Sequence, residues 1–351
     1  MSNARHEIVR EDLKAVLSAG IERLDDLRNE TLLITGGTGF VGTWLSELVA
    51  YLNDKHDFKT SLVLLSNSMN KYKKNVPHIA GRDDVRLIER DIRNLTDIPT
   101  DISYIIHAAA NPDSRVHASE PLRTVQIIVE GTNSVLEYAS RLSDVKRILN
   151  LSSGLIYGTQ PWDMPGISEN MIGGLDCGAF NSAYAESKRM AETICSIYRN
   201  QHRLPIVNAR PFAFIGPYQY LDRPWAINNF IRDGLLGGPI RILGDGRTIR
   251  SYMYPSDMAW WLLNILVRGK IGQSYNVGSP DSISLQELAE KIATNFPSRP
   301  KIVSGLSREQ GVQASKFVPN VDLAMRTLDL RITVNLDTAI SRTIRWNQIV
   351  D

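Results

Sequence analysis

Short apolar runs alternate with longer amphipathic segments between residues 31 and 205. The apolar runs are TLLIT (31–35), SLVLL (61–65), VRLIE (85–89), YIIHAAA (104–110) and RILNLSS (147–153). Their length and apolarity are typical of buried strands. VGTWLSELVAYLN (41–53) and TVQIIVEGTNSVLEYASRL (124–142) repeat apolar residues at helical spacing instead. Buried strands that alternate with helices predict an α/β fold, a doubly wound parallel sheet of the Rossmann type with helices on both faces.

The pattern changes on both sides of this region. Residues 8–27 place apolar side chains near helical spacing, which predicts an amphipathic helical extension packed on the body or on a second subunit. After about residue 205 the chain becomes less regular and richer in proline, glycine and aromatic residues. We therefore expect a helical N-terminal extension over 1–30, a dinucleotide-binding domain over 31–205, and a smaller, mainly substrate-binding lobe over 206–351.

Composition and charge argue against several classes of function. The chain of 351 residues is 43% hydrophobic and 22% charged, and 40 basic against 38 acidic side chains leave a net charge of only +2. This balance gives no field that would favour nucleic acid or an anionic membrane as a partner. The apolar run MAWWLLNILV (258–267) is about half of what a bilayer requires, and the N-terminus has no apolar signal core. Cys177 and Cys195 lack metal-like spacing, so we expect a reduced, cytoplasmic protein without disulfides or a metal site.

A glycine-rich turn, TGGTGFVG (35–42), follows the first apolar run and opens the first amphipathic segment. A helix N-terminus offers unpaired N–H groups and partial positive charge, and glycines let a pyrophosphate approach them. Gly36 and Gly39 fit this role, and Gly42 also eases contact between helix and strand. Glycines alone are equally consistent with a plain turn, but the strand–turn–helix context favours a dinucleotide site.

The end of the second apolar run bears on which dinucleotide is bound. An acidic residue there would bond the ribose hydroxyls of NAD, whereas its absence admits the 2′-phosphate of NADP. Ser66 and Asn67 occupy this position without a carboxylate, and Lys71, Lys73 and Lys74 follow. We therefore favour NADP over NAD, with lysines that only solvate a loop as the alternative.

A further group of residues indicates proton transfer. The segment 180–200 predicts a helix, on which Tyr184 and Lys188 lie one turn apart. A lysine cation at that spacing favours the phenolate of a tyrosine, whose ordinary pKa of about 10 makes it a poor base. Ser153 ends a predicted strand at the edge where doubly wound sheets bind ligands, so its hydroxyl could bond a sugar oxygen. As alternatives, Tyr184 and Lys188 could be surface residues without a catalytic role, and Ser152 and Ser153 could cap the following turn.

Several motifs occur together, in one order along the chain. They are TGGTGFVG, DIR (91–93), HAAA (107–110), LSSGLIYG (151–158), YAESK (184–188), ARPFAFIGP (209–217), GDGRTIRSYMYPSDM (244–258) and YNVGS (275–279). Together they resemble the extended short-chain dehydrogenase/reductase family, specifically its nucleotide-sugar epimerases, dehydratases and ketoreductases. The resemblance covers nearly the whole chain after residue 30. SSGLIYG and RPFAFIGPYQ are also similar to deoxysugar-pathway enzymes of bacterial surface polysaccharides.

The resemblance implies a catalytic group and contacts to a nucleotide-sugar substrate. Tyr184 would be the acid–base residue, Lys188 its partner and ribose ligand, and Ser153 the third catalytic member. Substrate contacts would come from Ser153, Gly154 and Arg250. Arg250 would neutralise the diphosphate of the substrate, and a surface salt bridge is its alternative role.

The resemblance also implies a cofactor site along the sheet edge, with Asp91 and Ile92 bordering the adenine. The implied cofactor set is Gly36, Gly39, Phe40, Val41, Gly42, Ser66, Asn67, Asp91, Ile92, Ala108, Ala109, Tyr184, Lys188 and Pro211. Family members often dimerise through two helices each, so we expect a homodimer with helices 124–142 and 182–199 at its interface.

Departures from the family pattern narrow the chemistry. 4,6-Dehydratases and sugar-acid decarboxylases usually carry an acid between the catalytic hydroxyl and the YG pair, where this chain has Gly154, Leu155 and Ile156. Removal of a C5 proton then lacks a general acid or base. Ala213 and Ile128 replace asparagines that commonly touch the substrate phosphates or support the fold. We therefore expect NAD(P)-dependent hydride transfer at C4 of a nucleotide sugar, by a 4-epimerase or 4-ketoreductase. The alternatives are a 4,6-dehydratase and a non-catalytic nucleotide-sugar binding protein.

Five other residues are candidates of lower specificity. We expect His107, His117 and Asp113, near the end of the fourth predicted strand, to be structural rather than ligand-binding. Trp162 and Trp225 could line the sugar or base pocket, with plain packing as the alternative.

Overall fold

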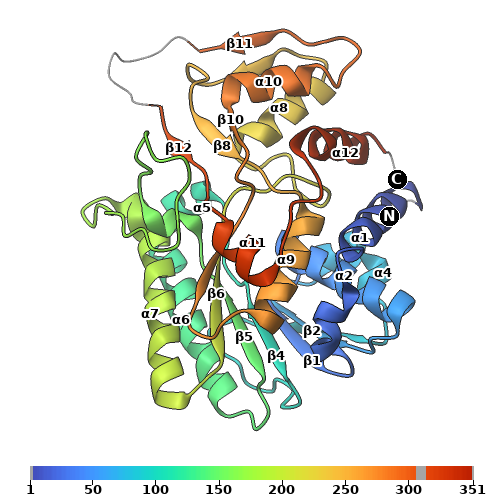
Figure 1. Cartoon of the computed structure of the whole chain (residues 1–351), viewed down its shortest axis with the longest axis vertical. Helices are drawn as coiled ribbons and strands as arrows, with labels where there is room; N and C mark the ends of the chain where they lie inside the picture. The colour runs from blue at the N-terminus through green and yellow to red at the C-terminus, as the bar shows by residue number, and fades with distance from the viewer. Residues whose placement is uncertain (1–2, 306–313, 350–351) are drawn as a thin grey trace.

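The computed structural model describes residues 3–305 and 314–349. Its larger part is a seven-stranded sheet in the order β3-β2-β1-β4-β5-β6-β9, in which each neighbouring pair is parallel (Figure 1). The strands are β1 (Thr31–Thr35), β2 (Ser61–Ser66), β3 (Val85–Glu89), β4 (Tyr104–His107), β5 (Arg147–Leu151), β6 (Ile206–Pro211) and β9 (Ser274–Val277). The first five of these begin at the residues where the apolar runs predict strands.

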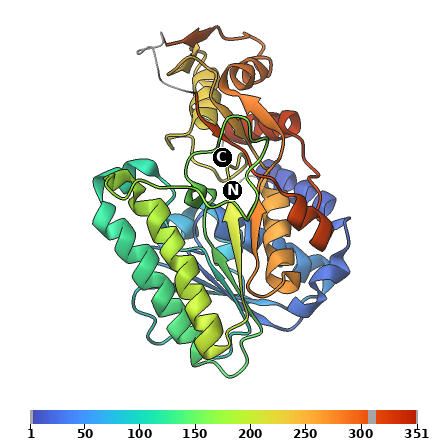
Figure 2. The same cartoon turned by 60° about the vertical axis from the view of Figure 1, so that its left-hand side comes forward.

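Helices cover both faces of this sheet (Figures 1 and 2). The helices are α1 (Asn3–Leu17), α2 (Phe40–His56) and α9 (Pro255–Arg268) on one face, and α6 (Pro121–Ser140) and α7 (Ala183–His202) on the other. The side chains of β1 alternate accordingly. Leu32 and Ile34 belong to the core cluster that contains Trp44 of α2, whereas Leu33 belongs to the cluster that contains Cys195 of α7. The predicted doubly wound α/β fold is confirmed.

The strand order reverses between β1 and β4. From β1 the chain adds β2 and then β3 on one side, and it crosses back to add β4, β5 and β6 on the other. Loops that leave the carboxyl ends of β1 and β4 therefore diverge to opposite faces of the sheet. Such a switch point opens a crevice at the carboxyl edge, which is where doubly wound sheets bind ligands.

A smaller lobe lies over this edge (Figure 1). Its elements are α8 (Ala226–Leu235), β7 (Ile240–Ile242), β8 (Ile249–Ser251), β10 (Ser282–Ser284), α10 (Leu285–Ala293), β11 (Ile302–Ser304), β12 (Lys316–Phe317) and α12 (Leu336–Gln348). The lobe has its own core, in which Phe230, Ile240, Leu288 and Ile340 are buried. The chain after residue 205 thus builds this lobe and also supplies β6, α9 and β9 to the large sheet.

Gly20 interrupts the helix that the sequence predicts over 8–27. α1 ends at Leu17 and a 3₁₀ helix covers Ile21–Leu27. Between them Gly20 has a φ of 123°, a conformation that a side chain disfavours. α1 packs on the body of the protein, where the buried carboxylate of Asp12 accepts a hydrogen bond of 2.6 Å from Tyr254. Of the two packing partners considered from the sequence, the body is the one observed.

The remaining short helices are α3 (Asn70–Asn75), α4 (Pro77–Ala80), α5 (Ser114–Ser119) and α11 (Asp322–Leu328). Within the described part of the chain, no helix combines the length and apolarity needed to cross a bilayer. The same residues contain no group of three or more His, Cys, Asp or Glu side chains arranged to hold a metal ion.

Candidate active site

A cavity of about 500 Å³ lies between the carboxyl edge of the parallel sheet and the smaller lobe. Ten of the residues that the resemblance implies as catalytic, cofactor-binding or substrate-binding line it: Gly36, Gly39, Phe40, Val41, Ala108, Ser153, Tyr184, Lys188, Pro211 and Arg250. They come from loops after β1, β4, β5 and β6, from α7 and from β8. The fold therefore brings together, in one cavity, motifs that are far apart along the chain.

The glycine turn after β1 has a geometry that only glycine satisfies. Gly36 has a φ of +68°, and a Cβ there would lie 2.8 Å from the backbone oxygen of Ala108. A Cβ at Gly42 would lie 2.4 Å from the oxygen of Gly37, so this residue lets α2 pack against the turn. Gly39 caps α2, and the first residues of that helix line the cavity. The turn thus leaves a helix N-terminus open to the cavity, which is the environment that a pyrophosphate fits.

The residues expected at the adenosine end lie outside the cavity lining. Ser66, the last residue of β2, accepts a hydrogen bond of 2.7 Å from Thr38 in the glycine turn. Asp91 is exposed, and hydrogen bonds from Arg93 lower its pKa to about 2. Ile92 is buried beneath Gly131 of α6, since a Cβ on that glycine would lie 2.9 Å from it. These residues border the same sheet edge as the cavity but do not form its wall.

Asn67 and Ala109, two further members of the implied cofactor set, also lie outside the cavity lining. Asn67 is exposed just after β2, and Ala109 adjoins Gly36, whose Cβ would lie 2.9 Å from the Ala109 Cα. Of the lysines that follow β2, Lys71 lies with its ammonium 3.8 Å from the ring centre of Tyr220. Lys73 and Lys74 are exposed in the last turn of α3.

Ser153, Tyr184 and Lys188 converge at one end of the cavity. Tyr184 and Lys188 are buried on α7, and the Lys188 ammonium lies 6.0 Å from the centre of the Tyr184 ring. Burial raises the pKa of Tyr184 to about 12, and a hydrogen bond with Ser153 opposes that rise. Burial lowers the pKa of Lys188 to about 8, while its ammonium donates a hydrogen bond of 2.6 Å to the Leu151 carbonyl. At neutral pH the tyrosine is therefore protonated and the lysine predominantly charged.

Neighbours fix the orientation of the tyrosine. The imidazole of His117 stacks on the Tyr184 ring with 4.1 Å between centroids and 13° between planes. Its Nε2 lies 2.6 Å from the backbone oxygen of Asn111. On the other side, Ile128 belongs to the same apolar cluster as Tyr184. The isoleucine that departs from the family pattern thus packs beside the proposed acid–base residue.

Only one of the three residues between Ser153 and Tyr157 faces the cavity. These residues form a 3₁₀ turn capped by Ser153, whose hydroxyl accepts a hydrogen bond of 3.1 Å from the Leu155 N–H. Gly154 packs against Phe212 and Phe317, and Ile156 is buried in a separate core cluster. Leu155 lines the cavity with 46% of its surface exposed. The position from which an acid could reach the sugar is therefore occupied by an apolar side chain.

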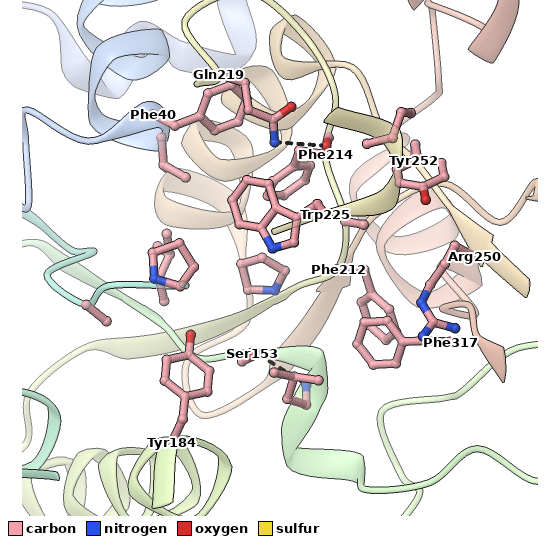
Figure 3. A pocket seen from close by; sticks show the side chains of 18 of the residues that line it. Phe40, Ser153, Tyr184, Phe212, Phe214, Gln219, Trp225, Arg250, Tyr252 and Phe317 are labelled. Carbon is pink, nitrogen blue, oxygen red and sulfur yellow. Dashed lines mark hydrogen bonds between the residues drawn. The ribbon is translucent and has the colours of Figure 1, made fainter. Parts of the chain in front are cut away.

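Arg250 stands apart from Tyr184 in the cavity (Figure 3). Its guanidinium donates to the Ile249 carbonyl at 2.8 Å, and to the Ser315 carbonyl and hydroxyl at 3.2 and 2.9 Å. Within residues 3–305 and 314–349 it forms no ion pair, and burial lowers its pKa from the ordinary value. The structure thus holds an uncompensated cation in the cavity wall, in place of the surface salt bridge considered from the sequence.

Much of the cavity wall is aromatic, and the sequence reasoning did not identify this wall. Phe214 stacks on Phe40, and Phe212 on Phe317 at 4.5 Å between centroids. Trp225 also lines the cavity, which agrees with a pocket-lining role rather than plain packing. Trp162 is half-exposed and lies outside the lining. The signal that could have found Phe212 and Phe214 is their position in the ARPFAFIGP motif, whereas Phe40 already belongs to the implied cofactor set and Phe317 lies in no motif.

Gln219 is a second residue that the sequence reasoning missed. It lines the cavity and donates a hydrogen bond of 3.2 Å to the Phe214 carbonyl. Its buried side-chain oxygen has no hydrogen-bond partner among the described residues. Figure 3 shows Gln219 beside Phe40 at the cavity wall. A ligand donor could satisfy this oxygen.

His107 has a structural role. Its Nδ1 lies 2.8 Å from the Thr35 hydroxyl and its Nε2 lies 3.1 Å from the Thr132 hydroxyl. Thr132 donates its own proton to the Ile128 carbonyl, so it accepts from Nε2–H, and Nδ1 accepts from Thr35. Burial lowers the pKa of His107 to about 3 and keeps the ring neutral. The imidazole therefore ties β1, β4 and α6 together.

Asp113 joins two loops at the rim of the cavity. Its carboxylate caps α5 and pairs with Arg115 of that helix at 2.7 Å, and it pairs with Arg223 at 2.8 Å, in the loop before α8. The hydrogen bonds from Arg115 hold the pKa of this carboxyl well below its usual range. Pro112, next to Asp113, lines the cavity, and so does Trp225, two residues after Arg223. The ion pair thus fixes the cavity wall across the two parts of the molecule.

A partly buried ion pair joins α7 to the large sheet. Arg210, at the end of β6, pairs with Glu192 of α7 at 2.7 Å and donates a hydrogen bond of 2.8 Å to the Tyr157 hydroxyl. Tyr157 in turn donates to Asn276 of β9 at 2.8 Å. This network links α7 to the two last strands of the sheet.

The helices expected at a dimer interface are present as α6 and α7, which lie side by side (Figure 2). Leu122, Met190 and Ile197 on these helices are exposed apolar residues. The homodimer remains a prediction.

Comparisons with known proteins agree with this arrangement. The sequence model of the NAD dependent epimerase/dehydratase family matches residues 32–278. UDP-glucuronic acid decarboxylase 3 of Arabidopsis thaliana is 31% identical over 264 residues, which are 75% of this chain and 74% of that protein. An epimerase from Methanothermobacter thermautotrophicus superposes with a TM-score of 0.76 at 25% identity, covering 93% of this chain and 94% of that one. UDP-glucuronic acid 4-epimerase from Bacillus cereus, solved with UDP-glucuronic acid and NAD, has a TM-score of 0.75 at 21% identity, covering 90% and 98%, and is similar in fold.

Proposed function

Because the chain belongs to the NAD dependent epimerase/dehydratase family, of the extended short-chain dehydrogenase/reductase type, we propose that it transfers a hydride at C4 of a nucleotide-activated sugar. The reaction is 4-epimerisation or reduction of a 4-keto sugar. The observation that carries this proposal is the convergence of Ser153, Tyr184 and Lys188 in a cavity whose described lining residues include no Asp or Glu. Such a site can exchange a proton with a sugar oxygen, but it offers no carboxylate for chemistry at C5.

The glycine turn and the sheet edge would hold a nicotinamide dinucleotide. The cradle at Gly36 and Gly39 is of the kind that accepts a pyrophosphate, and Ser66 and Asn67 leave room for the 2′-phosphate of NADP. We therefore favour NADP over NAD. The bound nicotinamide would supply or accept the hydride.

Tyr184 would move the proton of the C4 oxygen. Because its pKa is raised to about 12, it is protonated at neutral pH and can donate to a C4 carbonyl oxygen. In the reverse direction it must act as the phenolate, which the Lys188 cation stabilises. Ser153 would hydrogen-bond the same sugar oxygen and orient it. Lys188 would also bind the ribose hydroxyls of the dinucleotide.

Arg250 would bind the diphosphate of the nucleotide sugar. It is a cavity-lining cation without an acidic partner in the described chain, so an anionic ligand would compensate its charge. With the diphosphate at Arg250 and C4 at Tyr184, the substrate would run across the aromatic wall. Two copies of the chain are expected to associate through α6 and α7.

Decarboxylation of a nucleotide sugar acid is the second candidate. It is favoured by the 31% identity to a protein named UDP-glucuronic acid decarboxylase. The apolar Leu155 at the cavity wall argues against it, since an acid or base for the C5 position is absent there.

The test of the proposal is the Tyr184→Phe variant, with Tyr198→Phe on the same helix as the matched control. Turnover is measured with NADPH or NADH and a panel of UDP- and dTDP-activated hexoses and 4-keto hexoses, with the sugars identified by mass spectrometry and NMR. We expect Tyr184→Phe to lower kcat by roughly a hundredfold or more, and Tyr198→Phe to retain activity. Unchanged turnover in Tyr184→Phe would contradict the assigned role of the tyrosine.

A further inference from the structure

Resting on the proposed function, we infer that the sugar of the substrate carries no carboxylate: its C5 substituent is uncharged, a methyl or hydroxymethyl group. This goes beyond the reaction at C4, which any hexose could undergo. It also separates this chain from the relatives that are named UDP-glucuronic acid decarboxylase. The inference depends on which side chains surround the reacting end of the cavity and on where its charges lie.

The cavity-lining neighbours of Tyr184 and Ser153 are largely apolar, since the His117 imidazole that stacks on Tyr184 lies outside the lining. If these two hydroxyls bond the C4 oxygen, then the substituent on the adjacent C5 lies within a few bond lengths of them. Besides Ser152, the cavity-lining neighbours in these loops are Ala110, Pro112 and Leu155. Leu155 is closest along the chain, since its backbone N–H donates to the Ser153 hydroxyl at 3.1 Å. The isobutyl side chain of Leu155 would therefore lie where a charged C5 substituent would need a charged or hydrogen-bonding partner.

The cations that line the cavity are already committed. Among the described lining residues they are Lys188 and Arg250. Lys188 donates to the Leu151 carbonyl at 2.6 Å and stabilises Tyr184 and the ribose. Arg250 is held by Ser315 away from Tyr184 (Figure 3) and is assigned to the diphosphate. Among the described lining residues, a carboxylate near C4 therefore has no guanidinium or ammonium left to pair with.

Other arginines near the cavity lie outside its lining and already pair with acids of the protein. Arg223, at the rim, shares the buried carboxylate of Asp113 with Arg115, at 2.8 and 2.7 Å. Arg210, below the aromatic wall, pairs with Glu192 at 2.7 Å. Burying a carboxylate without a compensating charge is costly, so a uronic acid is expected to bind at least about tenfold more weakly than the matching neutral hexose.

The test compares UDP, UDP-glucose and UDP-glucuronic acid as probes, each titrated calorimetrically into the full-length protein saturated with NADP⁺ or NAD⁺. We expect UDP-glucose to bind at least tenfold more tightly than UDP-glucuronic acid. Equal binding of the two sugars, or tighter binding of the acid, would overturn the inference and leave the proposed function standing. Binding of none of the three probes, and of neither dTDP nor dTDP-glucose titrated in the same way, would overturn the proposed function, and the inference with it.

A pair of variants tests the position of the substituent. Leu155→Arg supplies a cation at the half-exposed side chain and should reduce the preference for UDP-glucose by at least severalfold. Leu155→Gln, which is neutral, should keep the preference close to that of the wild type. If both variants change the ratio equally, or Leu155→Arg leaves it unchanged, then Leu155 does not face the C5 substituent and the inference fails.

Discussion

Lys188 is buried as a cation, so it makes the unliganded protein less stable than an apolar residue would. Its pKa falls from 10.5 to about 8 because burial disfavours the charged ammonium. That shift corresponds to about 3 kcal/mol of unfavourable free energy at pH values below 8. Removal of the lysine also deprives the Leu151 carbonyl of a donor, which costs about 1–3 kcal/mol. The net effect of Lys188→Met at neutral pH is therefore a gain in stability of up to about 2 kcal/mol.

The pH dependence of the free energy of unfolding tests this reasoning more sharply than the stability difference at neutral pH. Between pH 8 and 10.5 the unfolded chain keeps a proton on Lys188 that the folded chain has lost. The free energy of unfolding of the wild type therefore rises with pH over this window, by about 3 kcal/mol relative to Lys188→Met. Subtracting the two proteins cancels the titration of other groups.

The assay is urea unfolding of the dinucleotide-free protein, followed by circular dichroism across this pH range. Lys55→Met, on the exposed surface of α2, serves as the control and should follow the wild type. We expect Lys188→Met to be at least as stable as the wild type at neutral pH and less stable in alkali. A stability difference that stays constant with pH would refute the reasoning, because the lysine would then keep its ordinary pKa in the folded protein.

Other features of the site lead to further predictions. Gly36→Ala forces a side chain onto a φ of +68° and puts a Cβ 2.8 Å from a backbone oxygen, so NADPH or NADH should bind at least roughly tenfold more weakly by fluorescence titration. Wild-type affinity would argue against the cradle. Arg223→Gln breaks the pair with Asp113 across the cavity rim and should raise KM for the nucleotide sugar severalfold with little change in kcat. Arg115→Gln, which breaks a pair between α5 and its own N-cap residue, should change neither, and equal effects of the two variants would contradict the bridging role. Glu192→Gln removes the counter-charge of the partly buried Arg210, which keeps its hydrogen bond to Tyr157, and should lower the free energy of unfolding by about 1–3 kcal/mol in urea. A loss under about 0.5 kcal/mol would show that the pair is well solvated.

The sequence predicts β1 to β5 of the large sheet because they are short, largely apolar runs, of which β3 at the sheet edge is partly exposed. It does not predict β6 and β9, whose sequences IVNARP and SYNV interrupt the apolar pattern with polar residues. The runs at 104–110 and 147–153 are nevertheless longer than the strands, since β4 ends at His107 and β5 at Leu151. Apolarity does not mark where strand pairing stops. The excess residues leave the sheet at its carboxyl edge, and most of them line the cavity, so the error falls at the candidate site.

Two other features required the three-dimensional structure. Gly20 ends the first helical segment, although the apolar spacing continues through it, because periodicity does not register a single residue with φ of 123°. The aromatic wall joins segments that are more than a hundred residues apart along the chain. The ion pair between Asp113 and Arg223 does the same, with a sequence separation of 110 residues. Local pattern carries no information on such contacts, whereas the phosphate cradle and the Tyr184–Lys188 spacing are local and could be read directly.

Local sequence patterns position some residues of the candidate site, and long-range contacts position the others. This difference explains why the sequence predicts the chemistry at C4 more readily than the substrate. The glycine turn, Tyr184 and Lys188 lie on the sheet and on α7, and their spacing is fixed by the periodicity of those elements. The residues that would contact the sugar and its diphosphate, such as Leu155 and Arg250, lie on a 3₁₀ turn and on a three-residue strand of the lobe. A change at Leu155 alone could therefore redirect the fate of a sugar oxidised at C4 without disturbing the fold, because that side chain is half-exposed in the cavity and supports no core cluster.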